Sequence, residues 1–186
     1  MSSDIRALVE RFQKGDQQAF TELVNRFKKT IYAVAYRRLK NHLDADEVTQ
    51  ETFVRVYKKI GELKSSQNFR SYIIRIALNF CTDLIRRRKK LVPVDELTSQ
   101  SDMSLSAAGS ISSPERNLEN AEIISEIEDA IEWLPPKQKM AFILHDLEGF
   151  SKSEVAKIMN CPQATVRSNL HIARTKLKKW LAKKFQ

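Results

Sequence analysis

Hydrophobic residues recur at steps of three and four along most of the chain, a spacing that predicts amphipathic helices. The pattern is clearest between residues 151 and 181, where two such runs flank a short turn. Ser151 and Glu154 have the spacing of a capping box that starts the first helix, and Asn160-Cys161-Pro162 ends it. The second helix is expected to begin near Pro162 or Gln163. Its inward stripe consists of Val166, Leu170, Ala173, Leu177 and Leu181.

The opposite face of this second helix is polar. At about 100° per residue it presents Ala164, Arg167, Ser168, His171 and Thr175. A tight turn followed by a helix with small or polar outer residues and an arginine is typical of a DNA-binding helix-turn-helix. The same spacing also fits an ordinary pair of helices in a core, so periodicity alone leaves both interpretations open.

The first half of the chain is also predicted to be helical. One long apolar stripe runs through residues 20–39, a second helix is expected from Asp44 to about Ile60, and a third from about Phe69 to Lys90. The polar segment 61–68 separates the last two helices. The inward positions are Phe20, Leu23, Val24, Phe27, Ile31, Val34, Ala35 and Leu39, then Val48, Phe53, Val56 and Ile60, then Phe69, Tyr72, Ile73, Ile76, Phe80 and Leu84.

Two outer faces of these helices carry charge. Asp44, Glu47 and Glu51 fall at steps of three and four and form an acidic edge with Gln50 beside it. A solvated face with an internal pair between Glu51 and Arg55 would explain this edge equally well. The third helix ends in five consecutive cations, residues 86–90. Its outward positions are Arg75, Asn79, Thr82 and Arg86.

Residues 91–117 differ in composition from both flanks. They are rich in Ser and Ala, include two Pro and one Gly, and lack a long helical period. A span of this kind is more often a linker than a loop inside a domain. With only four Gly and five Pro in 186 residues, hairpins are not expected. We therefore expect an all-α protein with two small helical domains, residues 1–90 and 118–186, joined by a flexible linker at 91–117.

The net charge of +9 and the isoelectric point near 9.6 favour a polyanionic partner. Residues 155–186 contain eight Lys and Arg and no acid, whereas residues 118–154 contain three Lys against nine acids. The basic part coincides with the second helix of the helix-turn-helix, as expected for contacts with phosphates. Membrane-surface binding by this end, with Trp180 and Phe185, is the less favoured alternative.

No catalytic or metal-binding pattern is present in the sequence. His42, His145 and His171 are scattered, no Gly-rich phosphate loop occurs, and no Cys/His spacing fits zinc. We expect no enzymatic activity, no cofactor and no metal. Cys81 and Cys161 each lie in an apolar helical context, which is typical of reduced thiols in a cytoplasmic protein. The charged N-terminus and the absence of a long apolar run predict neither a signal peptide nor membrane insertion.

Two stretches resemble a known family. DADEVTQETFVRVYKKI followed by FRSYIIRIALNFCTDLIRRRKK is similar to region two of the extracytoplasmic-function (ECF) sigma factors of bacterial RNA polymerase. AIEWLPPKQKMAFILHDLEGFSKSEVAKIMNCPQATVRSNLHIARTKLKKWL is similar to their region four. Order, spacing, linker and length agree over nearly the whole chain. The resemblance implies a factor that binds core RNA polymerase and directs promoter-specific transcription initiation without catalysis of its own.

The resemblance also implies roles for single residues. Phe69, the polar loop before it and Asn79 match positions that capture a base flipped out of the minus-ten element, while the cation run would hold phosphates. Arg167 and Ser168 match positions that read the minus-thirty-five element in the major groove. The implied set for binding core polymerase is Asp46, Glu47, Gln50 and Glu51. The implied minus-ten set is Phe69, Arg75, Asn79, Arg86, Arg87 and Arg88. The implied minus-thirty-five set is Ala164, Thr165, Arg167, Ser168, His171 and Arg174.

Some positions depart from the family pattern. The family usually has Trp-Leu at Tyr72-Ile73 and Gly at Ala164, and it often has basic residues at Asn169 and Ile172. The last two differences remove phosphate or base contacts beyond Arg167 and Ser168.

Two other functions share parts of the pattern. A helix-turn-helix transcriptional regulator would normally carry an α/β receiver domain, whose strands are not predicted here. A sigma-mimicking decoy of an anti-sigma factor would lose the DNA-reading residues, whereas Asn79, Arg167 and the cation run are retained. The family further implies an anti-sigma factor as a partner.

Overall fold

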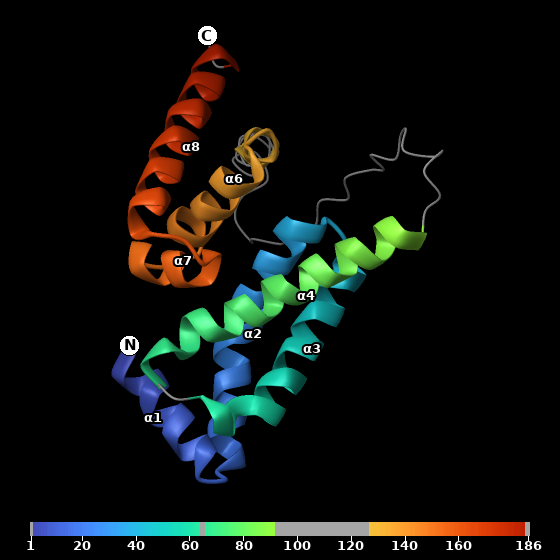
Figure 1. Cartoon of the computed structure of the whole chain (residues 1–186), viewed down its shortest axis with the longest axis vertical. Helices are drawn as coiled ribbons and strands as arrows, with labels where there is room; N and C mark the ends of the chain where they lie inside the picture. Colours follow the sequence, from blue (N-terminus) through green and yellow to red (C-terminus); the bar gives the residue numbers. More distant parts are fainter. Residues whose placement is uncertain (1, 64–65, 92–126, 185–186) are drawn as a thin grey trace, which may run out of the picture.

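The computed structural model describes residues 2–63, 66–91 and 127–184, and within them every regular element is helical (Figure 1). The N-terminal half contains α1 (Ser2–Gln13), α2 (Gln17–Leu39), α3 (His42–Lys59) and α4 (Phe69–Leu91), with 3-10 turns at Ile60–Glu62 and Ser66–Asn68. In the C-terminal half residues 127–132 are helical, followed by α6 (Pro136–Phe142), a π-helical turn (Ile143–Leu147), α7 (Lys152–Met159) and α8 (Gln163–Lys184). The expected all-α architecture is confirmed. The predicted linker, residues 91–117, lies outside the described residues except for Leu91.

Local capping sets the limits of the first helices. Gly15, with φ +97°, allows the chain to reverse after α1. The Asp16 carboxylate then accepts hydrogen bonds from the backbone N–H groups of Gln18 and Ala19 and starts α2. Lys40 ends α2 in the left-handed conformation, and the Asn41 side chain caps α3. Because of this cap, α3 begins at His42, two residues before the expected start.

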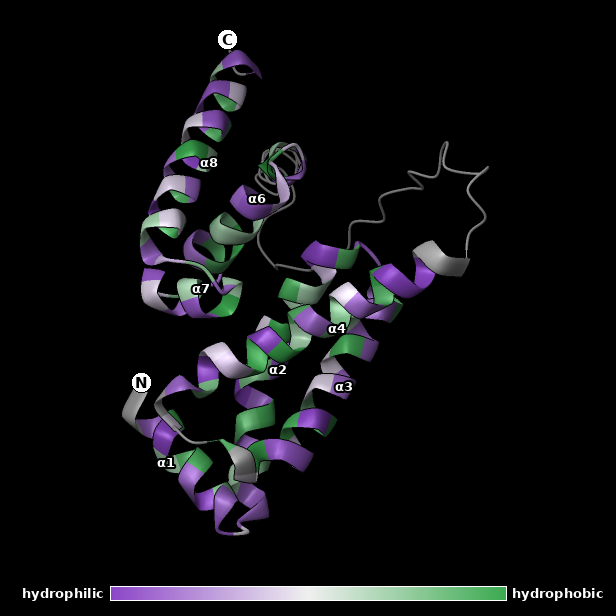
Figure 2. Ribbon diagram, viewed as in Figure 1, coloured by the Kyte–Doolittle hydropathy of each residue, from purple (hydrophilic) through white to green (hydrophobic). Residues whose placement is uncertain are grey.

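The core of the N-terminal half forms around α2, which packs against α1, α3 and α4. Each long helix is hydrophobic on one face and hydrophilic on the other (Figure 2). The apolar side chains that α2 buries are Ala19, Leu23, Phe27, Ile31, Val34 and Ala35. These are members of the predicted stripe, with Ala19 added.

The C-terminal half contains the expected helix-turn-helix. The capping box is present, since Ser151 and Glu154 exchange side-chain to backbone hydrogen bonds at the start of α7. Asn160 ends α7 in the left-handed conformation, and α8 begins at Gln163. The predicted inward residues Val166, Leu170, Ala173 and Leu177 are buried on α8.

The two halves pack directly on each other. α7 lies against α4 (Figure 1), and one continuous apolar cluster includes residues of both halves. A second cluster, inside the C-terminal half, lies between residues 130–143 and α8.

Candidate nucleic-acid and polymerase interfaces

The outer face of the recognition helix α8 is open to solvent at its N-terminal end. Five of the six residues predicted for the minus-thirty-five element are exposed there without an ion pair in the described part of the chain: Ala164, Thr165, Arg167, Ser168 and His171. Val166 and Leu170, fully buried on the other side, fix the rotation of the helix. Arg167 is the only one of the five with a permanent positive charge, so it can approach a base edge or a phosphate.

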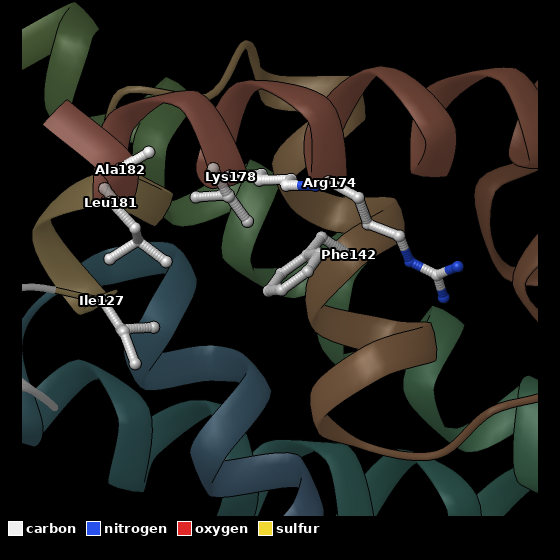
Figure 3. A pocket seen from close by; sticks show the side chains of 8 residues that line it. Ile127, Phe142, Arg174, Lys178, Leu181 and Ala182 are labelled. Atoms are coloured by element: carbon white, nitrogen blue, oxygen red, sulfur yellow. The ribbon is translucent and has the colours of Figure 1, made fainter.

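Arg174, the sixth residue of that set, lies at the edge of the helix. Its guanidinium hydrogen-bonds the Asp146 carboxylate through Nε at 3.2 Å and through a terminal nitrogen at 2.5 Å. This bond raises the pKa of Arg174 above its ordinary value. Arg174 also borders an apolar groove of about 560 Å³ between α8 and the preceding helices. Figure 3 shows Ile127, Phe142 and Leu181 grouped in this groove while the guanidinium of Arg174 points away from them.

The outer face of α4 carries the polar stripe expected from the sequence. Arg75, Asn79 and Arg86 are exposed, with Thr82 half-buried between them. Arg87 is exposed on a neighbouring side of the helix. Over about three turns of α4, these positions present a solvent-facing amide flanked by guanidinium groups.

Two members of the predicted minus-ten set are placed differently. Phe69 is fully buried, and its ring lies edge-on to the Phe27 ring with centroids 5.5 Å apart. A ring enclosed in this way offers no free face for a base, so the expectation that Phe69 stacks on a flipped base does not fit this structure. Arg88 forms an ion pair with Asp44.

The outer face of α3 contains the predicted docking residues. Asp46, Glu47 and Gln50 are exposed. Glu51 accepts a hydrogen bond from Arg55 at 2.7 Å, as the internal-pair alternative foresaw, and the Arg55 guanidinium lies 4.7 Å from the centroid of the Phe80 ring. The carboxylates of this face that form no ion pair within the described residues are therefore Asp46 and Glu47.

Asp44 does not belong to this acidic edge, which corrects the expectation. Only 6% of the residue is exposed, because it lies in the first turn of α3 between the Asn41 cap and Arg88. The burial of Asp44 could not be predicted from neighbouring residues in the sequence, because its partner Arg88 belongs to a different helix, α4.

Three exposed apolar residues on α3 extend this outer face. Leu43, Val54 and Tyr57 are 79%, 44% and 47% exposed, among the large hydrophobic residues with the most exposed surface in the described chain. They share one side of the helix with Glu47 and Gln50, because residues 43, 47, 50, 54 and 57 follow steps of four and three. The same spacing is visible in the sequence, as apolar residues that do not belong to the inward stripe.

Metal-binding clusters and membrane-spanning helices are both absent from the described residues. They contain no cluster of His, Cys, Asp or Glu that could hold a metal ion. Among them, no helix combines the length and apolarity needed to cross a bilayer. Cys81 is buried, and burial raises the pKa of its thiol to about 12.

Two family models match the two halves of the chain. The family model for Sigma-70 region 2 matches residues 23–91, and the model for Sigma-70, region 4 matches residues 124–177. The RNA polymerase sigma-H factor of Pseudomonas aeruginosa is 32% identical over 177 residues, which is 94% of this chain and 92% of that protein. The ECF RNA polymerase sigma-E factor of Escherichia coli K12 is 34% identical over 172 residues, 91% of this chain and 90% of that protein. The chain belongs to the ECF sigma factor family.

The sigma factor therefore binds core RNA polymerase and directs promoter-specific transcription initiation. The chain matches both region 2 and region 4, which supports the sigma-factor interpretation over a helix-turn-helix regulator.

Two solved structures share its fold at lower identity. A structure of CnrH in complex with the cytosolic domain of CnrY has 23% identity and a TM-score of 0.70, with 96% of this chain and 97% of CnrH covered. The sigma factor RpoE of Bartonella quintana, in complex with the anti-sigma factor NepR, has 21% identity and a TM-score of 0.71, with 88% and 96% covered.

Proposed function

We propose that this sigma factor works through three surfaces: the outer face of α3 for core polymerase, the outer face of α4 for the minus-ten element, and the N-terminal turns of α8 for the minus-thirty-five element. The observation that carries the assignment is that all three faces are exposed and carry charge of the sign that their partner requires. α3 presents carboxylates, whereas α4 and α8 present guanidinium groups to a polyanion.

The docking face combines apolar and acidic side chains. Leu43, Glu47, Val54 and Tyr57 lie along one stripe of α3, and Asp46 lies beside it. Protein interfaces of this composition gain affinity from desolvating the apolar side chains, while the charges set orientation and association rate. A basic surface of the polymerase with exposed apolar side chains fits such a face.

The minus-ten surface uses Asn79 as the group that can read a base edge and Arg75, Arg86 and Arg87 as phosphate contacts. Asn79 has both a donor and an acceptor, so it can pair with an unstacked base. Because Phe69 is buried, no observation supports an aromatic contact to a base. Base recognition at the minus-ten element is therefore assigned to the Asn79 amide.

Arg167 is the residue proposed to read a base pair of the minus-thirty-five element. It is exposed on the first turns of α8, the part of a recognition helix that enters the major groove. Ser168 and Thr165 on either side are short enough to let the helix approach the bases. Arg174 is held by Asp146 and is proposed as a phosphate contact only.

An anti-sigma factor is proposed as the regulatory partner. The sigma factor RpoE is complexed with the anti-sigma factor NepR, and CnrH with the cytosolic domain of CnrY, and this chain shares their fold. We further propose that the factor acts in the cytoplasm, where transcription takes place, and has no enzymatic activity of its own.

Run-off transcription tests the proposal. Core polymerase is incubated with genomic fragments with and without the protein, and the transcript start sites are mapped. Discrete start sites that require the protein, preceded by a shared pair of sequence elements, are the expected result. An identical set of transcripts in both reactions would contradict the proposed function.

A further inference from the structure

Ile172 is an exposed apolar residue on the recognition helix α8. Among the large hydrophobic residues that are exposed in the described chain, it is the one that lies on α8, with 37% of its surface exposed. It belongs to neither apolar cluster of the described residues, and α8 packs instead through the buried side chains of Val166, Leu170, Ala173 and Leu177. The core packing of α8 therefore does not require an apolar side chain at position 172.

The helix itself does not favour isoleucine at this position either. Lysine, arginine and alanine suit an exposed helical position better, because a β-branched side chain loses χ1 freedom against the preceding turn. The same restriction keeps the side chain of Ile172 largely in one rotamer, so its methyl groups have a fixed direction before a partner arrives. An apolar contact made by Ile172 therefore costs little additional side-chain entropy.

Ile172 and Arg167 lie on opposite flanks of the face of α8 that points away from the core. Five residues at about 100° each place the two side chains roughly 140° apart around the helix. The middle of that face carries the short side chains of Ala164, Ser168 and Thr175, all of which are exposed. Short side chains in the middle let the helix approach the floor of a groove closely, so that the longer side chains on both flanks reach base edges.

Ile172 also lies within the turns of α8 that fit into the major groove. It is the tenth residue of a helix that begins at Gln163, and it lies about 8 Å along the helix axis from Arg167. The major groove of B-DNA is about 12 Å wide and admits an α-helix. The exposed neighbours of Ile172 one turn away on either side are Ser168 and Lys176. This flank is therefore free of acids, and it carries a cation one turn further along the helix.

The chemistry of Ile172 restricts what it can recognise on DNA. Its side chain has no donor or acceptor, so it can bond neither a phosphate nor the polar edge of a base. The apolar group that a base pair presents in the major groove is the 5-methyl group of thymine. We propose that Ile172 is a specificity-determining residue that contacts the methyl group of a thymine in the minus-thirty-five element, the element whose guanidinium contact is assigned to Arg167. The inference rests on the proposed placement of α8 in that element.

The test compares thymine with uracil, which lacks only this methyl group. A promoter library randomised over the minus-thirty-five element is first transcribed by core polymerase loaded with the wild-type protein, which identifies the positions where thymine is preferred. The same complex then binds synthetic promoters that carry deoxyuridine at one of these positions at a time. At one position the substitution should weaken binding about fourfold, the effect of losing the burial of one methyl group. Ile172→Ala should weaken binding to the thymine promoter at least as much, and it should no longer distinguish thymine from uracil at that position.

Two variants serve as controls. Ile172→Val keeps the β-branched side chain and should retain a measurable preference for thymine over uracil. Leu147→Ala removes an apolar side chain that is 42% exposed in the same half of the chain but outside α8, and it should discriminate as the wild type does. All of these positions are exposed, so circular dichroism should show the same helical content and the same unfolding temperature within a few degrees for each variant.

Three results would overturn the proposal. The wild type could show no preference for thymine in the element, or every deoxyuridine substitution could affect the wild type and Ile172→Ala equally. Ile172→Ala could also weaken binding to all promoter sequences by the same factor, as a contact with the polymerase would. In each of these cases Arg167→Ala would still relax the preference at its own base pair. Failure of the proposed function would differ, because transcripts would then not depend on the protein at all.

Discussion

Arg88, in the run of cations that ends α4, donates a hydrogen bond to the carboxylate of Asp44 in the first turn of α3. The Asp44 side chain is 9% exposed and that of Arg88 is 57% exposed. The pair ties the start of α3 to the end of α4. Arg88 is therefore held in an intramolecular ion pair, whereas Arg86 and Arg87 form none in the part of the chain that the structure describes.

Replacing Asp44 by Ala should lower the free energy of unfolding by about 1–2 kcal/mol. The cost is one charge-assisted hydrogen bond and a favourable charge at the start of a helix, while Arg88 can remain hydrated. Urea unfolding followed by circular dichroism measures the change. Asp46→Ala is the control, because Asp46 is exposed on the same turn and its loss should cost less than about 0.5 kcal/mol. Equal losses in the two variants would show that the Arg88 pair contributes no stability.

Reversing charge on the docking face should prevent association with the polymerase. Glu47→Lys combined with Glu51→Lys places cations opposite a partner expected to be basic, and both positions have enough solvent contact to leave the fold intact. Co-purification with core polymerase measures the effect, with Glu22→Lys on α2 as a control at another exposed acid. Retained binding by the double variant would show that this face of α3 is not part of the polymerase interface.

The apolar residues of that face allow a separate prediction. Leu43→Ala should weaken polymerase binding at least about tenfold, because burying a leucine side chain contributes about 1.5–3 kcal/mol. Its stability should stay within about 0.5 kcal/mol of the wild type, since Leu43 is 79% exposed in the free protein. A titration of labelled protein with core polymerase gives the ratio of the dissociation constants of the variant and the wild type. An affinity equal to that of the wild type would show that Leu43 does not contribute to polymerase binding, which would then depend on the charged residues of this face.

Much of the helical framework could be predicted from the sequence because its signals are local. The capping box at Ser151, the left-handed stop at Asn160 and the apolar stripe of α8 each depend on residues within a few positions of one another. Partners that come from other helices could not be predicted in this way. Periodicity predicted that Asp44 and Arg174 lie exposed without an internal partner. In the structure, Asp44 pairs with Arg88 and Arg174 pairs with Asp146, and each partner comes from a distant part of the chain.

The same limit applies to burial at element ends. Phe69 has the position of a base-capturing ring in the family pattern, but the packing of Phe27 and Tyr72 around it is decided by the whole N-terminal core. The ion pairs between the two halves could not be predicted from the sequence either. Their residues are separated by more than 80 positions, and the charge surplus of residues 118–154 was the only trace of them.

Thiol reactivity provides a test of the N-terminal core. With a pKa of about 12, roughly one Cys81 thiol in ten thousand is ionised at pH 8, whereas the half-buried Cys161 lies at the turn of the helix-turn-helix. One thiol should react rapidly with Ellman's reagent in the native protein and two after unfolding, and Cys161→Ser should abolish the rapid phase. Because the pKa of Cys81 is higher in the folded state, its contribution to stability is complete below about pH 8.5 and declines as the pH rises towards 12. Two rapid thiols in the native protein would contradict this packing.

The two DNA-reading surfaces should control different promoter positions. Arg167→Ala should cost about 1–3 kcal/mol at one base pair of the minus-thirty-five element and relax the preference there, because a guanidinium can bond two acceptors on one base edge. Asn79→Ala should leave that preference intact and instead impair selection or opening at the minus-ten element. Arg174→Ala serves as the comparison on α8, since a residue held by Asp146 should weaken binding to all sequences about equally. Transcription from a library randomised at both elements gives the preference at each position for the three variants. If Arg167→Ala and Asn79→Ala changed the preference at the same position, the exposed faces of α8 and α4 would not be separate reading sites, and the two-surface assignment would have to be withdrawn.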